Sequence, residues 1–156
     1  MRAVVTRVSR ADITINGEKG GSIGKGLLVL LGINHNDTEK ECKYLAEKCI
    51  GLRIFEDENG KMNKELKDFG GEIMLVSNFT LYADCSHGKR PSFINAARPE
   101  QAIPLYEKFK NVLKESGINF VTGEFGADMQ IDHVNDGPVT IIMDTDEMQR
   151  SRKNGN

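Results

Sequence analysis

Hydrophobic and polar residues alternate along the first part of the chain. Residues 2–9 and 11–15 have a period of two, which is typical of strands, and the Asn16-Gly17 pair after them is typical of a hairpin turn. Residues 27–31 are hydrophobic at every position, so both faces of that segment are expected to be buried. The pattern therefore predicts strands over both regions, with residues 27–31 as a central strand.

Another strand is predicted over residues 72–82, which contain neither Gly nor Pro. Its end is polar, because Ser77-Asn78-Phe79-Thr80-Leu81 would place hydroxyl and backbone N–H groups at the edge of a core. A second polar stretch, residues 135–140, lies near the other end of the chain, and we expect the two stretches to form one site. Ser77 and Thr80 have opposite parity on a strand, so both face one ligand only if the strand ends or bulges between them.

Two stretches repeat hydrophobic residues with the period of a helix. The first begins at Thr38, which has a Glu three residues later in the spacing of a capping box. The second begins at Pro99 and ends at Gly117. Pro104 interrupts this second pattern, so either the helix proper starts there or its first turn is kinked.

The remaining segments complete the expected fold. Residues 83–98 show no clear period and are expected to be mostly loop. The order of strands, helix, strands, helix and strands predicts an α+β fold with a mostly antiparallel sheet, curled toward a barrel and packed by two main helices. We expect a single domain over residues 1–148 and a disordered polar tail over residues 149–156. The other short strands are predicted at residues 52–55, 118–122, 127–134 and 139–144.

The net charge gives no overall reason to bind nucleic acid, since the 156 residues carry a formal charge of −2. Contact with phosphates would need a local basic patch. The lysines of the long second helix are equally well explained as its solvated face. The candidate cations are Lys89, Arg90 and Arg98 in one set, and Lys108, Lys110 and Lys114 in the other.

Cysteine usage argues against a disulfide framework or a structural zinc site. Cys42, Cys49 and Cys85 are odd in number and include no Cys-x-x-Cys pair. Cys42 and Cys49 lie on the hydrophobic stripe of the first predicted helix and are expected in the core. No signal peptide opens the chain, and its most hydrophobic run, residues 27–33, is too short to cross a membrane. We therefore expect a cytoplasmic protein with no membrane segment.

The residues alone identify no reaction. His35, His87 and His133 are scattered without metal-ligand spacing, so we expect no metal and no cofactor, and a metal-dependent hydrolase is only an alternative. A Ser-His-Asp triad is recognised by geometry and stays open, although Ser77 lacks a Gly-x-Ser-x-Gly context. A single hydroxyl such as that of Ser77 or Thr80 is most often a capping group.

Several segments, in the same order along the chain, resemble the D-aminoacyl-tRNA deacylase family from Met1 to about Asp144. Two signatures carry the resemblance: the family's Ser-Gln-Phe-Thr-Leu, here residues 77–81, and its Asn-x-Gly-Pro followed by Val or Thr, here residues 135–139. Asn78 stands where the family has Gln and is one methylene shorter. The surrounding segments are MRAVVTRVSRADITINGE, GLLVLLGI, LRIFEDENGKMN, VSNFTLYADCSHGKRPSF and FGADMQIDHVNDGPVTIIMD.

The resemblance implies an enzyme that hydrolyses the ester joining a D-amino acid to the terminal adenosine of tRNA. It implies a homodimer with its sites at the subunit interface, and tRNA as the other partner. A cis Gly137–Pro138 bond would enter the partner's site and point carbonyl oxygens at the substrate amino group, with Arg7 holding the motif. Substrate would then be bound by Asn78, Gly137, Pro138 and Arg7.

Physical chemistry is compatible with this implied recognition. Two parallel carbonyl groups are good acceptors for an ammonium group. With the amino group and the ester held, the side chain of an L-substrate would strike backbone, so rejection requires no recognition of the side chain. Glycine has no side chain to clash, and its ester is expected to be accepted as well.

The hydrolytic step has two competing interpretations. Backbone N–H groups around Asn78 to Thr80 would stabilise the oxyanion in either case, and we count Ser77 and the Phe79 backbone among the catalytic groups. Thr80 would act as a nucleophile or help a base, or the ribose 2′-hydroxyl of the tRNA would activate the attacking water. We favour the second, because no base is committed to Thr80. A non-catalytic RNA-binding module on the same scaffold is the alternative from another class.

Overall fold

The sheet is organised around β1 (Arg2–Ile15). In the computed structural model, which describes residues 1–153, one edge of β1 pairs first with β3 (Gly26–Gly32) and then with β2 (Glu18–Ile23). The other edge pairs with β8 (Met129–Asp144), and all three pairings are antiparallel. The two strands predicted over residues 2–15 are therefore one continuous strand.

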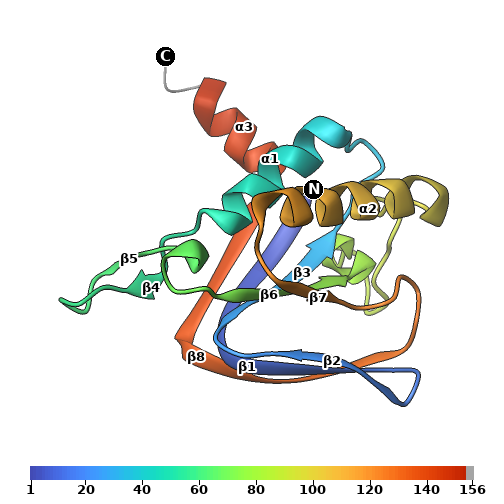
Figure 1. Cartoon of the computed structure of the whole chain (residues 1–156). Helices are drawn as coiled ribbons and strands as arrows, with labels where there is room; N and C mark the ends of the chain where they lie inside the picture. The colour runs from blue at the N-terminus through green and yellow to red at the C-terminus, as the bar shows by residue number, and fades with distance from the viewer. Residues whose placement is uncertain (154–156) are drawn as a thin grey trace.

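Parallel strands extend the sheet beyond β3. β6 (Glu72–Ser77) pairs with β3, and β7 (Phe120–Thr122) pairs with β6, so the strand order is β2-β1-β3-β6-β7 with β8 beside β1 (Figure 1). Gly21 of β2 lies so close to β7 that an added methyl group would come within 2.6 Å of Val121 Cγ1. The sheet is thus mixed and nearly closes into a barrel, which confirms the predicted α+β class of a single domain.

Two long helices cover one face of the sheet (Figure 1). The α1 helix (Glu39–Ile50) begins with the predicted capping box, in which the Thr38 hydroxyl accepts a hydrogen bond from the Lys40 amide at 3.2 Å. The α2 helix (Pro99–Ser116) begins at Pro99 and continues through Pro104, and it ends at Gly117 in the left-handed region. Between helices and sheet lies the main core, which includes Ala3, Val5, Val29, Leu45, Leu75 and Phe109.

A second core fills the inside of the curled sheet. The residues facing it come from strands on both sides of the near-closure, so the curl is stabilised by its own hydrophobic contents. This arrangement leaves the end of β6 at the rim of the barrel, where the candidate site lies. The buried members are Val8, Ala11, Ile13, Ile23, Leu28, Met74 and Val76.

Several elements differ from those predicted. β2 was not predicted, because its Gly20 and Gly21 hide the alternation. Residues 55–64 form a hairpin of β4 (Phe55–Glu56) and β5 (Met62–Lys64), followed by the short helix η1 (Leu66–Asp68), in place of a strand over residues 52–55. β8 is one strand rather than two, since it bulges at the Gly137–Pro138 bond without ending there.

The end of the described chain is helical where the composition predicted a disordered tail. The α3 helix (Thr145–Lys153) begins with a 2.9 Å hydrogen bond from the Asp146 amide to Asp144 Oδ1. The acidic residues in its first turn interact favourably with the positive end of the helix dipole. Gln149 ties α3 to α1 through a 3.1 Å hydrogen bond to Glu41. Residues 154–156 lie outside the described residues. No helix in the part of the chain that is described is long and apolar enough to cross a bilayer.

Burial of the α1 thiols predicts alkaline destabilisation. Removal from water raises the pKa of Cys49 from its ordinary 9.0 to about 12. A raised pKa contributes stability below pH 9, and that stability is lost as the pH rises from 9 through 12, because the unfolded chain releases its proton first. We expect the free energy of unfolding to fall there by up to about 1.4 kcal/mol per pH unit for this thiol.

Urea titrations between pH 7 and pH 11 measure this effect. Cys49→Ala is expected to be less stable at neutral pH but to lose stability less steeply above pH 9. The exposed Cys85 supplies the control, since Cys85→Ala should keep the slope of the unmodified chain. If the free energy of unfolding fell equally steeply with pH in all three proteins, ionisation of Cys49 would not be the cause of the loss.

Candidate active site

The strand β6 ends at Ser77, not at Tyr82 as predicted. The Asn78 amide makes a last hydrogen bond to the Leu31 carbonyl at 2.8 Å, and the chain then turns into the 3₁₀ helix η2 (Phe79–Tyr82). The turn packs over Gly32 of β3, where a methyl group would lie 2.9 Å from Leu81 Cβ. Because the strand ends between Ser77 and Thr80, the alternation of side chains along a strand no longer requires these two residues to point to opposite faces.

A side chain from β1 fixes the position of η2. Arg2 Nη1 donates a 2.7 Å hydrogen bond to the Leu81 carbonyl, and its guanidinium pairs with Asp144 at 2.8 Å. The same guanidinium lies 4.6 Å from the centre of the Tyr82 ring. Burial raises the pKa of Tyr82, so its phenol stays protonated at neutral pH and is no candidate base.

Two amide groups at the start of η2 are available to a ligand. In the described part of the chain, the N–H groups of Phe79 and Thr80 have no hydrogen-bond acceptor, because the first residues of a helix have no carbonyl behind them. Adjacent unpaired amides at the rim of a barrel are suitable donors to an oxyanion. The Thr80 hydroxyl donates to Asn78 Oδ1, an amide oxygen that cannot act as a base at neutral pH.

An aromatic cavity of about 440 Å³ opens beside these amides. Phe79 is 56% exposed and meets the Phe93 ring edge to face, with 5.1 Å between ring centres. Phe125, from the segment between β7 and β8, also lines the cavity, and Arg98 contributes a cation to its lining. Phe93 and Phe125 were not predicted as site residues; their only signal is the presence of aromatic residues in segments without a hydrophobic period.

The second predicted stretch forms a bulge in β8. The register passes from Thr6 opposite Thr140 to Val8 opposite Asn135, so residues 136–139 lie outside the ladder and Arg7 alone faces them. The Asn135 side chain closes the bulge, since its oxygen accepts from the Val139 amide and its nitrogen donates to the Thr140 hydroxyl, both at 3.3 Å.

Arg7 lies under this bulge and is only 7% exposed. Its Nε donates to the Asp136 carbonyl at 3.0 Å, and its Nη1 donates to the Ile54 carbonyl at 2.7 Å. The guanidinium also lies 3.5 Å from the Asp136 carboxylate, which balances its charge. A buried arginine thus holds the backbone just before the Gly137–Pro138 bond.

The Gly137–Pro138 peptide bond is cis, as the resemblance implies, and both residues are exposed. Gly137 has a φ of +133°, which favours glycine. A methyl group here would lie 2.8 Å from Val139 Cγ2 and 2.9 Å from the Val139 amide nitrogen. The conformation of the bulge therefore depends on the absence of a side chain at residue 137.

One chain does not bring the two stretches together. β3 and β1 lie between β6 and β8, which places the stretches about 14 Å apart across the sheet at roughly 4.8 Å per strand. Ser77 is level with Ala3 of β1, whereas the bulge is level with Arg7, four residues or about 13 Å further along at 3.3 Å per residue. The expectation of one site therefore requires two chains.

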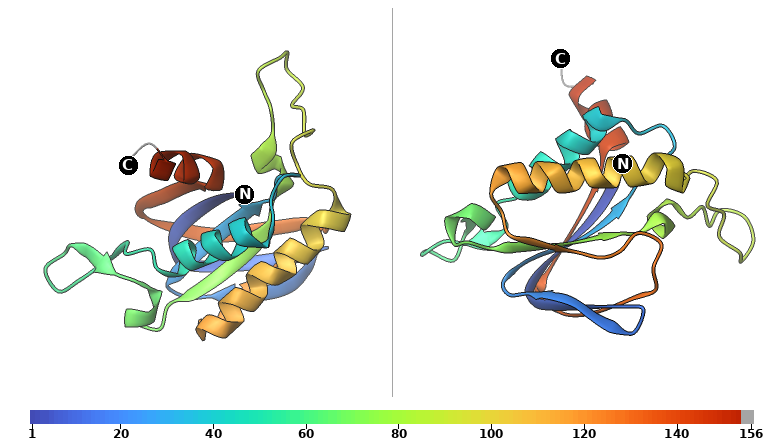
Figure 2. Two further views of the ribbon diagram at one scale, coloured as in Figure 1. Left: turned by 90° about the horizontal axis from the view of Figure 1, so that it is seen from above. Right: turned by 45° about the vertical axis from the view of Figure 1, so that its right-hand side comes forward.

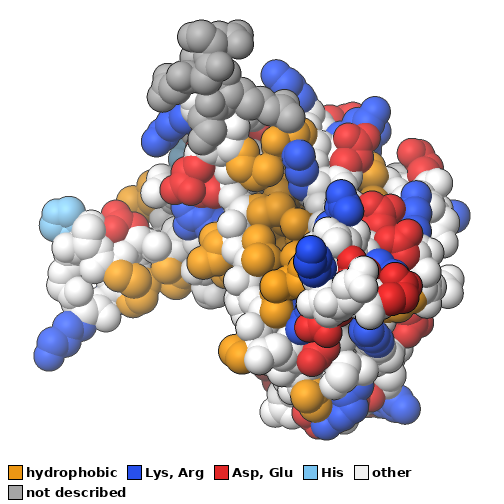
Figure 3. All heavy atoms as spheres, turned by 90° about the vertical axis from the view of Figure 1, so that its left-hand side faces the viewer, with side chains coloured by type: hydrophobic (Ala, Val, Ile, Leu, Met, Phe, Trp, Pro, Cys, Tyr) orange, Lys and Arg blue, Asp and Glu red, His pale blue; other side chains and the backbone are white. Residues whose placement is uncertain are grey.

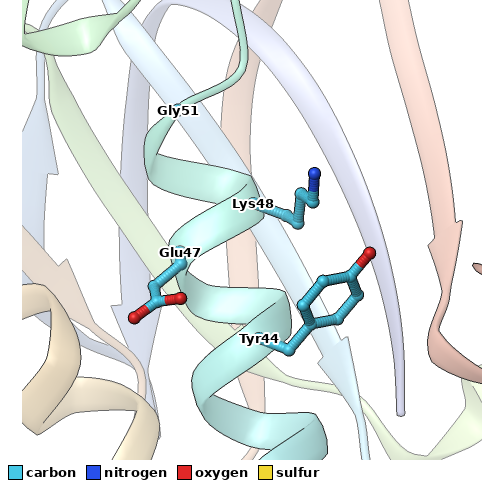
Figure 4. A pocket seen from close by; sticks show the side chains of 4 residues that line it. All are labelled: Tyr44, Glu47, Lys48 and Gly51. Atoms are coloured by element: carbon cyan, nitrogen blue, oxygen red, sulfur yellow. The ribbon is translucent and has the colours of Figure 1, made fainter.

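A separate hollow of about 400 Å³ lies beside α1 (Figure 4). Lys48 and Tyr44 point to one side of the helix, with the lysine nitrogen 5.6 Å from the centre of the ring, and Glu47 points away from both. Its described lining residues come from α1 and the Gly51 that follows it, so no second element contributes a group to it. We assign no chemistry to this hollow.

Unpaired backbone donors beside an aromatic cavity, on this α+β fold, suit a substrate that carries a carbonyl group. A family model described as D-Tyr-tRNA(Tyr) deacylase matches residues 4–144. The chain belongs to this family.

Individual relatives agree with this assignment. The chain is 53% identical to a D-aminoacyl-tRNA deacylase of Thermus aquaticus, over 97% of this chain and 100% of the relative. It is 58% identical to one of Clostridium botulinum, over 93% and 97%. A solved structure of a protein named c-Myc DNA Unwinding Element Binding Protein has 43% identity and a TM-score of 0.85, with 93% of this chain and 99% of that chain covered.

Proposed function

We propose that the protein hydrolyses the ester between a D-amino acid and the 3′-terminal adenosine of tRNA, releasing the free D-amino acid and tRNA. In this reaction a water molecule attacks the ester carbonyl, and the departing ribose oxygen receives a proton. The observation that carries the proposal is the pair of unbonded amides of Phe79 and Thr80, which would stabilise the negative carbonyl oxygen of the intermediate. Family membership supports the choice of ester.

The proposed chirality check uses backbone oxygens of the Gly137–Pro138 segment of the partner subunit. These would accept hydrogen bonds from the substrate ammonium, while Arg7 keeps the segment in place. The exposure of the segment and the two hydrogen bonds of Arg7 support this role. An L-amino acid held by the same groups would direct its side chain into backbone, whereas glycine would fit, so we also propose activity on glycyl-tRNA.

The aromatic cavity is proposed to receive the terminal adenine. A nucleobase stacks on aromatic rings with about 1–3 kcal/mol of stabilisation. Phe79 and Phe93 offer such faces directly beside the two free amides. This placement would set the ester at the start of η2, where its carbonyl oxygen meets the donors.

We also propose a homodimer with shared sites. The separation of the two stretches within one chain supports it, and so does the outer edge of β8, since within the described chain β8 pairs only with β1. Figure 3, which faces the side that carries β8, shows a band of hydrophobic side chains on this surface. Ile142 of β8 is 71% exposed, and a second chain packed against β8 would remove this side chain from water.

Sedimentation and subunit mixing test the dimer. Two chains of 17.3 kDa should sediment as one species of 34.6 kDa at micromolar concentration. Gly137→Ala and Phe79→Ala, each strongly impaired alone, should regain activity after their subunits are exchanged, because one site of the mixed dimer then has both native stretches. A monomer, or no recovery in a mixture shown to contain heterodimer, would refute shared sites.

The function itself is tested with pure protein and three esters: D-tyrosyl-tRNA, L-tyrosyl-tRNA and glycyl-tRNA. We expect hydrolysis of the D-ester and the glycyl ester, with the L-ester left close to its spontaneous rate. Persistence of activity after dialysis against EDTA separates this enzyme from a metal-dependent hydrolase. No hydrolysis of the D-ester would overturn the proposal.

A non-catalytic nucleic-acid-binding module is the second candidate function. The solved relative with 43% identity is named for binding a DNA element, and that name favours this candidate. Such a module would bind nucleic acid without releasing amino acid from any charged tRNA. The hydrolysis assay therefore decides between the two.

We place the protein in the cytoplasm, where charged tRNA is made and used. The free thiols of Cys42, Cys49 and Cys85 fit a reducing compartment.

A further inference from the structure

A loop beside the candidate site projects from the body of the protein (Figure 2). Residues 84–92, here called the arm, are closed at their base by two backbone hydrogen bonds between Asp84 and Ser92, of 2.8 and 2.9 Å. Gly88 turns the chain at the far end, with a φ of +67°. The arm is thus a defined structure and has the shape of a short hairpin.

The far end of the arm carries positive charge. Lys89 and Arg90 are exposed, and neither forms an ion pair with any residue that the structure describes. Figure 3 shows the arm projecting to the left with Lys and Arg side chains at its end. The only acid of the arm, Asp84, lies at its base, where its carboxylate accepts the Ser86 amide at 2.9 Å.

The lysines of α2 differ from these cations. Lys108 pairs with Glu39 at 3.3 Å, and Lys110 pairs with Glu107 at 3.0 Å. The charges of these two lysines are balanced within the protein, which supports their interpretation as a solvated helix face, whereas Lys114 forms no ion pair with a described residue. Of the two candidate basic patches, the arm is the one with two adjacent cations that remain available to a partner.

The residues on both sides of the arm in the sequence line the cavity proposed to hold the terminal adenine. η2 leads into the arm, and the chain that returns from it supplies Phe93, Ile94 and Ala96 to the cavity wall. Arg98, also exposed, lies at the rim of the same cavity. A polynucleotide whose last base occupies the cavity must leave it through the opening, and the arm stands at that rim.

We propose that the arm binds the sugar-phosphate backbone of the tRNA just before its terminal adenosine, through Lys89 and Arg90. This inference rests on the proposed function and adds a binding surface for RNA outside the reacting centre. The contact is electrostatic and independent of base sequence, because contacts to phosphates position a nucleic acid without reading its bases. The arm therefore acts on substrate capture and not on the ester itself.

The salt dependence of binding gives the expected size of the effect. Each phosphate neutralised by a cation contributes a slope of about −0.7 to −0.9 to the logarithm of affinity against the logarithm of salt concentration. Loss of two contacts should make this slope shallower by about 1.4 to 1.8. At about 0.1 M salt, this corresponds to a loss of roughly tenfold to a hundredfold in affinity.

The test compares the full chain with the charge-reversed variant Lys89→Glu/Arg90→Glu on two substrates. D-tyrosyl-tRNA carries the backbone before the last nucleotide, and D-tyrosyl-adenosine lacks it. We expect kcat/KM for the tRNA to fall tenfold to a hundredfold through KM, and kcat/KM for D-tyrosyl-adenosine to stay within twofold. The anisotropy of labelled, uncharged tRNA should show the same loss of affinity and the shallower salt slope.

Lys67→Glu/Lys114→Glu is the matched control, because it changes the net charge equally at the far end of α2. Both lysines are exposed, and this variant should bind tRNA like the unmodified protein. Equal losses on both substrates, equal losses in both variants, or a variant that sediments as a monomer while the unmodified protein is a dimer would each overturn the role of the arm. Unmodified protein that binds tRNA but hydrolyses neither ester would instead contradict the proposed function, and the binding data would still report on the arm.

Discussion

Gly137→Ala should lower kcat/KM for D-tyrosyl-tRNA by at least about a hundredfold, the cost expected when a binding group is displaced by about 1 Å. The added methyl group would meet Val139 at 2.8 and 2.9 Å, and a φ of +133° is unfavourable for any residue with a side chain. The bulge must move to relieve these contacts, and its carbonyl oxygens move with it. Activity on L-tyrosyl-tRNA should not increase, because capture and rejection use the same segment.

Gly60→Ala is the matched control for this substitution. Gly60 also has a positive φ, +73°, but a methyl group on it meets nothing within 4 Å. This variant should carry the cost of a side chain at positive φ and keep full activity. Circular dichroism and thermal melts confirm that both variants fold. A folded Gly137→Ala protein with the rate of the unmodified chain would show that chirality is read elsewhere.

A D-tyrosyl-tRNA that ends in 2′-deoxyadenosine should be hydrolysed about 10² to 10⁴ times more slowly than the ribose form, the range for loss of a group that moves a proton in the transition state. The reason lies in Thr80, whose hydroxyl donates to the amide oxygen of Asn78 and, among the described residues, forms no hydrogen bond to a base. Thr80→Val, which preserves shape, should therefore keep its rate within about tenfold of the unmodified enzyme. Single-turnover hydrolysis with each substrate separates chemistry from binding.

Thr14→Val, on β1 away from η2, controls for the loss of a strand-end hydroxyl. If folded Thr80→Val falls to the spontaneous rate while Thr14→Val does not, Thr80 is the nucleophile or supports a base. Full activity on the deoxy substrate would independently show that the ribose 2′-hydroxyl does not activate the attacking water.

The local patterns of the sequence predict what local physics decides. The capping box at Thr38, the period-two alternation of residues 2–9 and 11–15, and the helix that starts at Pro99 all depend on residues a few positions apart. The end of β6 does not, because nothing between residues 72 and 82 breaks a strand. The strand ends where Gly32, on another strand, leaves room for the chain to turn.

The site shows the same division. Residues 77–81 and 135–139 can be selected from the sequence, and the structure places them on β6 with η2 and on β8. The aromatic cavity cannot be selected, because Phe93 and Phe125 meet Phe79 only after the chain has folded. The four-residue bulge is equally hidden, since its size depends on the register between β1 and β8.

The hydrogen bonds of Arg7 have a consequence for how this protein tolerates mutation. Both of its acceptors, the carbonyls of Asp136 and Ile54, belong to the main chain, which every amino acid provides. Substitutions at residue 54 can therefore accumulate without changing its bond. A substitution at residue 136 keeps the backbone bond but removes the carboxylate that balances the guanidinium charge. Lysine at residue 7 would lack the planar fork that reaches both carbonyl oxygens. The guanidinium also joins the residue before the β4–β5 hairpin to the bulge. A substitution at residue 54 that leaves the backbone in place would not affect the bulge. A change in the backbone path there would be transmitted through Arg7 to residue 136, which lies 82 positions later in the chain.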